Sequence, residues 1–184
     1  MNWRRMAALA GAAACAFSLG VTSVTSANVS GRTFANTFSI ANKLCMEVRA
    51  NGPNKHRKAF ATQIIADCTA LEMKFQELTT TALAGQAAIR TALAANKTTF
   101  QAACPKVPTS STPPAARRAC NTAAHNRQVV FHKLAFQRFE VLFTYHKGLD
   151  EARFTFWSAI KALPGSKGIK VDAVIPLPKP PKGS

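Results

Sequence analysis

The chain contains 184 residues, with 24 lysines and arginines against 8 acids, so its net charge at pH 7 is +16. This length leaves room for one domain behind a short leader, and no pair of the few acids has a spacing that compels a role in general acid–base catalysis. The charge excess is typical of proteins that contact acidic material, the alternative being a cationic surface that binds nothing.

The first 27 residues are typical of an export signal. Arg4 and Arg5 precede an apolar, Ala-rich run from position 6 to about 19, and the small residues at 25–27 suit a signal peptidase. The run is too short and too poor in large side chains for a transmembrane helix. We therefore predict a signal peptide over residues 1–27, whose removal lowers the net charge to +14. A mitochondrial presequence is the competing interpretation.

Residues 28–164 are predicted to form a disulfide-linked, all-α domain. Apolar side chains on one helical face predict a first helix from about Thr33 to Arg49. The sequence Asn51-Gly52-Pro53-Asn54 ends it, since glycine and proline together break helices.

The longest predicted element covers residues 59–104. Its larger apolar residues recur at steps of three and four, so one face stays apolar throughout. The threonine run 79–81 and Gly85 are poor helix formers, but the apolar stripe resumes in register at Ile89. We therefore predict one continuous helix, which must pack against other helices because much of its remaining surface is polar or small.

A loop with four prolines follows at residues 105–114, and a second long helix is predicted from Ala115 to about Lys147. Two interpretations stay open beyond it. In the first, Gly148 caps this helix and a separate helix covers residues 149–163. In the second, one kinked helix continues to residue 163. The predicted fold is a long antiparallel helical hairpin with a shorter N-terminal helix, as a three- or four-helix bundle.

Four cysteines remain after the signal, and an even number in an exported chain favours two disulfides. One continuous helix would hold Cys68 and Cys104 about 54 Å apart, which excludes a bond between them. Of the two remaining connectivities, the crossed one is geometrically awkward. We therefore predict Cys45–Cys68 and Cys104–Cys120.

Residues 165–184 are rich in lysine and proline and are predicted to form an extended tail. Prolines lack a backbone donor and lysines resist burial, so we expect this tail to make no contact with the core.

The order of charges along the hairpin predicts a binding surface. No acid lies between Glu77 and Glu140, and folding the chain near residue 109 brings these two acids to the same height. The half next to the loop is then purely basic over about 40 Å. We call its cationic side chains the basic pole and predict that they bind a ligand, the alternative being a chance gap. They are Arg90, Lys97, Lys106, Arg117, Arg118, Arg127 and Lys133.

Aromatic residues of the second long helix predict a second surface. One face is expected to pack on the first long helix, and it comprises Phe131, Leu134, Phe139, Leu142, Tyr145 and Leu149. Val129, Phe136 and Phe143 recur every seven residues away from that face. Either another helix covers this stripe, or it is a surface for a protein partner or a second copy.

Nothing in the sequence predicts a metal site, a cofactor or catalysis. The four histidines are scattered and no CxxC, haem motif, Gly-rich phosphate loop or nucleophile elbow is present. Sequons occur at Asn28 and Asn96, and they matter only in a eukaryotic secretory pathway.

The sequence therefore predicts a secreted or periplasmic, non-enzymatic protein with no transmembrane segment. Its predicted partner is a polyanion bound by the basic pole: a glycan, an egg-coat-like matrix, lipid head groups or nucleic acid. The alternative is an assembly subunit that docks a partner through the aromatic stripe, and salt dependence would separate the two.

Overall fold

The computed structural model describes residue 29 and residues 32–51, 60–106, 108–166 and 168–181. The chain divides into two units, Met1–Gly31 and Arg32–Ser184. The predicted signal peptide and the sequon at Asn28 lie outside the described residues. The second unit is all-α in its described part, with helices and no strands, which confirms the predicted fold class.

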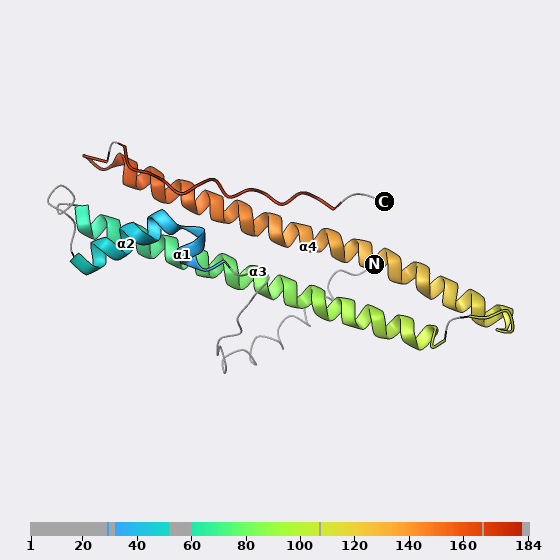
Figure 1. Ribbon diagram of the computed structural model, residues 1–184. Helices are drawn as coiled ribbons and strands as arrows, with labels where there is room; N and C mark the ends of the chain where they lie inside the picture. Colours follow the sequence, from blue (N-terminus) through green and yellow to red (C-terminus); the bar gives the residue numbers. More distant parts are fainter. Residues whose placement is uncertain (1–28, 30–31, 52–59, 107, 167, 182–184) are drawn as a thin grey trace, which may run out of the picture. The chain divides into compact units, whose positions relative to one another are not determined.

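The first long helix, α3, spans Ala61–Ala103 without interruption (Figure 1). The apolar stripe is buried as predicted, at Ile64, Cys68, Leu71, Phe75, Ala82 and Ile89. Gly85 does not break the helix, and it lies where α4 packs closely against α3. A Cβ atom built on Gly85 would lie 2.9 Å from Cγ2 of Val141. The absent side chain therefore allows the two long helices to approach each other.

The second long helix, α4, is one element over Pro114–Ala162, and its first proline supplies a φ that suits a helix start. This result corrects the interpretation in which Gly148 ends the helix and a separate one follows. Gly148 lies inside α4, and a Cβ atom there would lie 2.7 Å from Cδ2 of Leu78 in α3. As at Gly85, the glycine serves helix–helix packing.

The predicted N-terminal helix is interrupted, which is a second correction. It consists of α1, Phe34–Thr37, and α2, Ser39–Asn51, with Phe38 between them at φ −126° and ψ 57°. The ring of Phe38 is completely buried and lies 6.1 Å from that of Phe75 in α3. The ring of Phe38 thus packs in the core at the point where the helix is interrupted. The interruption leaves the first N–H groups of α2 without acceptors in the preceding turn.

Asp172 of the C-terminal segment accepts hydrogen bonds from the first N–H groups of α2. One carboxylate oxygen accepts from the N–H of Ile40 at 2.8 Å, and the other accepts from Ala41 at 3.1 Å and from Nε1 of Trp157 at 3.1 Å. A capping residue normally makes such bonds from the helix start itself. Phe38 has no polar side chain, so Asp172, which lies 131 positions after Ala41 in the sequence, caps α2 instead.

The C-terminal segment is extended but packed, so the expectation of no core contact was wrong. It returns along α4 (Figure 1), and Asp172 and Ile175 are 5% and 6% exposed. The N–H of Ile175 donates to Asp150 at 3.1 Å, and Nδ1 of His146 lies 2.8 Å from the carbonyl of Pro176. The described lysines of the segment, Lys170 and Lys179, are exposed, while Asp172 and Ile175 enter the core.

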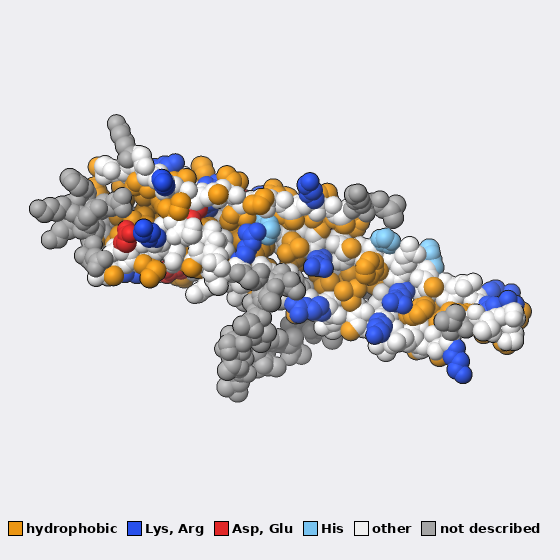
Figure 2. Space-filling model, in the orientation of Figure 1, with side chains coloured by type: hydrophobic (Ala, Val, Ile, Leu, Met, Phe, Trp, Pro, Cys, Tyr) orange, Lys and Arg blue, Asp and Glu red, His pale blue; other side chains and the backbone are white. Residues whose placement is uncertain are grey.

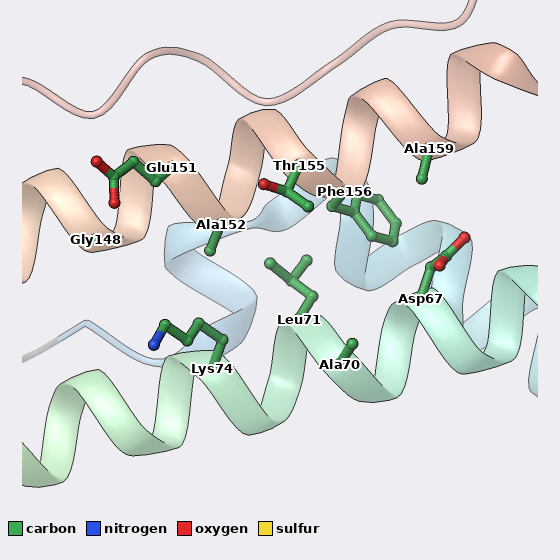
Figure 3. Close-up of a pocket in the computed structure, with 10 residues that line it drawn as sticks. All are labelled: Asp67, Ala70, Leu71, Lys74, Gly148, Glu151, Ala152, Thr155, Phe156 and Ala159. Carbon is green, nitrogen blue, oxygen red and sulfur yellow. The ribbon is translucent and has the colours of Figure 1, made fainter.

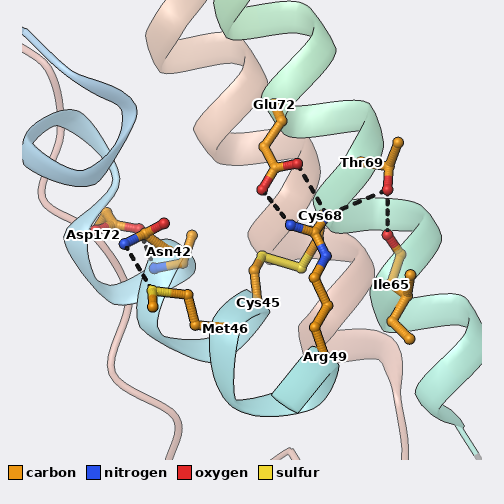
Figure 4. The surroundings of a disulfide bond; sticks show 10 residues. Asn42, Cys45, Met46, Arg49, Ile65, Cys68, Thr69, Glu72 and Asp172 are labelled. Carbon is orange, nitrogen blue, oxygen red and sulfur yellow. Dashed lines mark hydrogen bonds and ion pairs between the residues drawn. A yellow bond between two sulfur atoms is a disulfide. The ribbon is translucent and has the colours of Figure 1, made fainter.

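Both predicted disulfides are present. Cys45–Cys68 joins α2 to α3 (Figure 4), and Cys104–Cys120 joins the C-terminal end of α3 to the second turn of α4. Next to the first, Arg49 pairs with Glu72 at 2.7 Å and makes a second link between α2 and α3. Disulfides are typical of an oxidising compartment.

The hairpin thus has two halves of different construction. The tip half comprises residues 78–103 of α3 and 114–139 of α4, with the loop and its disulfide. The basal half comprises the remainder of both helices, against which α1, α2 and the segment around Asp172 and Ile175 pack. None of the described helices is both long and apolar enough to cross a bilayer.

Candidate functional site: a cationic hairpin tip

The residues of the predicted basic pole all lie at the surface of the tip half or its loop. Arg90 and Lys97 project from α3, Lys106 lies in the loop, and the others belong to α4. Every one of these side chains is exposed, including Arg117, Arg118, Arg127 and Lys133. The hairpin therefore gathers on one structural half cations that are separated by up to 43 positions in sequence.

Ion pairing differs between the two halves. The described pairs are Lys43–Glu47, Arg49–Glu72, Lys74–Glu77, Lys147–Glu151 and Arg153–Asp150, all in the basal half. Within the described residues, no cation of the basic pole is paired with an acid, because the tip half contains none. On the face that Figure 2 shows, Asp and Glu are visible only over the basal half. The positive charge of the tip is therefore not offset by neighbouring acids.

The helix dipoles do not create this positive potential. The C-terminus of α3 and the N-terminus of α4 meet at the tip, so their partial charges oppose each other. The side chains alone supply the charge. Arg117 and Arg118 even lie near the positive end of α4, where cations are unfavourable for helix stability.

Arg127 is the only described cation of the basic pole that rests on an aromatic ring. Its guanidinium carbon lies 4.7 Å from the ring centroid of Phe100 in α3, a cation–π contact. The side-chain amide of Asn96 donates to the backbone carbonyl of Arg127 at 3.1 Å. These two contacts fix the register of the helices near the tip. In this conformation the amide of the Asn96 sequon is engaged in an interhelical bond.

Sequence reasoning missed these roles of Asn96 and Phe100. A signal was available, since Asn96 stands between Leu93 and Phe100 at helical spacing on the apolar stripe of α3. A polar residue at such a position commonly bonds across the helix interface, because an unpaired amide is costly when partly buried.

The predicted partner stripe is only partly free. Val129 and Phe136 are 54% and 46% exposed, whereas Phe143 is half-buried with its ring 5.7 Å from that of Phe139. The face expected to pack on α3 is buried at Leu134, Tyr145 and Leu149, but Phe131 is 57% exposed. That part of the prediction was wrong. A two-helix hairpin covers only the centre of its seam, and in the described residues no third helix flanks Phe131.

A groove of about 410 Å³ lies between α3 and α4 in the basal half (Figure 3). Leu71 and Phe156 line its middle, Asp67 lies at one end, and Lys74 and Glu151 lie toward the other. Lys74 and Glu151 already take part in ion pairs, and Oδ1 of Asp67 accepts from Gln63 at 3.0 Å. The groove carries both signs of charge and is separate from the basic pole.

Among the described residues, no three potential metal ligands of the histidine, cysteine or carboxylate type come together. Comparisons with protein-family models, curated proteins and solved structures find no match to this chain.

Proposed function

We propose that this protein is an exported, non-enzymatic binding protein whose tip half contacts a polyanionic surface or macromolecule through the basic pole. The observation that carries the proposal is the acid-free tip, where exposed cations from both long helices stand together without an acidic neighbour. Cations in such an array raise the local potential well above the effect of net charge alone.

The location of the cations supports a ligand role over a stabilising one. Five cations outside the tip half, Lys43, Arg49, Lys74, Lys147 and Arg153, pair with acids of α2 or of the hairpin. Arg117 and Arg118 have no such partner among the described residues, and their position near the start of α4 opposes the helix dipole. Local stability therefore gives no reason for arginines at these two positions.

The compartment is part of the same proposal. The disulfides and the predicted signal peptide together support secretion or transport to a periplasm. There the protein would meet anionic glycans, anionic lipid surfaces or released nucleic acid, which share dense negative charge.

The test is binding of the purified, disulfide-bonded protein to heparin across a series of salt concentrations. Each ionic contact to a polyanion contributes about one to the slope of log affinity against log salt. The double variant Arg117→Gln/Arg118→Gln should weaken binding at fixed salt and reduce this slope by about two.

The matched control is Lys43→Gln/Lys74→Gln, which removes the same charge from the basal half, where both lysines are ion-paired. We expect a much smaller loss of affinity from it. An equal loss from both double variants would show that only net charge matters, and it would contradict a specific role for the tip.

A further inference from the structure

The face of α4 that points away from α3 combines charge with exposed apolar side chains. At 100° per residue, Val129, Lys133 and Phe136 lie within an arc of about 60°. Arg118 lies in the same direction toward the tip. Figure 2 shows hydrophobic side chains and Lys or Arg side chains beside one another over the tip half. We call these four residues the outer face.

The apolar members of the outer face are accessible to solvent. Val129 and Phe136 are 54% and 46% exposed. Exposing such side chains to water loses roughly 25 cal/mol for each square ångström of apolar area. What distinguishes this pair from exposed apolar residues elsewhere is that cations of the acid-free tip flank it on the same helix face.

Charge decides what kind of partner can cover the outer face. A second copy of the same tip would bring two acid-free, cationic surfaces together, and like charges in close contact repel. The partner must therefore be anionic. It must also offer an apolar layer, because Val129 and Phe136 gain little from a hydrated, purely polar surface.

We propose that the outer face binds an anionic lipid surface. This inference rests on the proposed function and specifies its ligand. Val129 and Phe136 enter the boundary between head groups and acyl chains, and Arg118 and Lys133 lie at the level of the lipid phosphates. Interfacial protein surfaces have this composition, with apolar side chains flanked by long cationic ones that reach up to the head groups.

A sulfated glycan or a nucleic acid fits this face less well. Both would be held by the cations, but neither offers a layer in which the side chain of Val129 is removed from water. Phe136 could stack on a nucleotide base, whereas an aliphatic side chain has no ring with which to do so. Lipid is the anionic partner that uses every member of the outer face.

The test is sedimentation of the full, disulfide-bonded protein with vesicles of phosphatidylcholine containing 30% phosphatidylglycerol, compared with phosphatidylcholine alone. We expect binding to the anionic vesicles only. The variant Val129→Gln/Phe136→Gln should lower this partitioning about tenfold. Its affinity for heparin should stay as in the unmodified protein, because no charge has changed.

The matched control is Met73→Gln/Phe154→Gln, which alters two side chains that are 65% and 66% exposed in the basal half. We expect its vesicle binding to equal that of the unmodified protein. Equal losses from both variants, or no loss from Val129→Gln/Phe136→Gln, would overturn the inference while leaving the proposed function intact. If the unmodified protein binds neither heparin nor anionic vesicles, both this inference and the proposed function are contradicted.

A fluorescence readout separates the remaining partners. Trp157 is buried in the basal half, so Phe136→Trp places a reporter at the outer face. We expect a blue shift of its emission with anionic vesicles and no response to oligodeoxythymidylate. A response to the oligonucleotide alone indicates a nucleic-acid partner. A blue shift in the free protein, with dimerisation in analytical ultracentrifugation, indicates a second copy. Either outcome contradicts the lipid proposal.

Discussion

The basal and tip halves of the hairpin are built from the same two helices, yet they differ in what covers them. In the basal half, α1, α2 and the C-terminal segment pack against α3 and α4, and side chains such as Leu149 and Ile64 are at most 1% exposed. In the tip half only the seam between the two helices is buried, as at Ile89 and Leu134, and Phe131 beside it is 57% exposed. The exposure of side chains on α3 and α4 therefore depends on whether α1, α2 and the C-terminal segment cover the two helices.

Charge follows the same division. The basal half compensates its cations with acids and long-range hydrogen bonds, so its polar groups serve the fold. The tip half has exposed cations with no acid among them. Stability thus resides mainly in one half and the candidate binding surface in the other, which allows either to be altered with limited effect on the other.

The largest expected effect contrasts two residues of α4. Leu149→Ala removes a completely buried side chain and should destabilise the protein by about 3–4 kcal/mol. Phe131→Ala deletes more atoms, but Phe131 is 57% exposed in the tip half, so the loss should be only about 1–2 kcal/mol. Urea denaturation measures both. Similar losses would mean that the tip is packed as tightly as the base.

The next effect tests how the C-terminal segment holds α2. Asp172→Ala leaves the N–H groups of Ile40, Ala41 and Trp157 without their acceptor. Losses for a helix cap and for buried donors suggest about 2 kcal/mol. Thermal unfolding should show this as a lower melting temperature. Glu47→Ala, which removes an exposed acid 4.0 Å from Lys43, is the control and should change stability by under about 0.5 kcal/mol.

A smaller effect depends on pH. The hydrogen bond from Arg153 holds the pKa of Asp150 below its ordinary value, burial opposes this shift, and the N–H of Ile175 lowers the pKa further. A carboxyl whose pKa is lower in the folded state stabilises the fold above its unfolded pKa of about 3.9. This stabilisation is lost as pH falls through the folded value.

We therefore expect Asp150→Asn to cost about 1 kcal/mol at pH 7, as measured by urea denaturation. The difference between this variant and the unmodified protein should shrink when both are compared at pH 3 or below. A difference that stays constant from pH 7 to pH 3 would show that the charge of Asp150 does not hold the C-terminal segment.

The smallest expected effect on stability belongs to the basic pole. Arg117→Gln/Arg118→Gln should leave the melting temperature unchanged or slightly raised, because cations are removed from the positive end of α4. A clear loss of stability would give these arginines a structural role and would weaken the division between the two halves.

Periodicity alone determined the main elements. The apolar stripe of α3 stayed in phase across the threonines and Gly85, and that phase predicted one helix long enough to exclude a Cys68–Cys104 bond. The proline loop then predicted the hairpin. The clustering of cations at the tip likewise followed from their order in the sequence and a single fold at the loop. These features depend on spacing along one helix, which the sequence states directly.

Only the tertiary structure decided the rest. The interruption at Phe38, the capping of α2 by Asp172 and the packed C-terminal segment each depend on contacts between residues far apart in sequence. Gly148 is a further example. Its helix propensity suggests a helix cap, whereas in the fold it lies inside α4, where the close contact with Leu78 leaves no room for a side chain. Local preferences amount to a few tenths of a kcal/mol up to about 1 kcal/mol per residue, and burial and long-range hydrogen bonds exceed them.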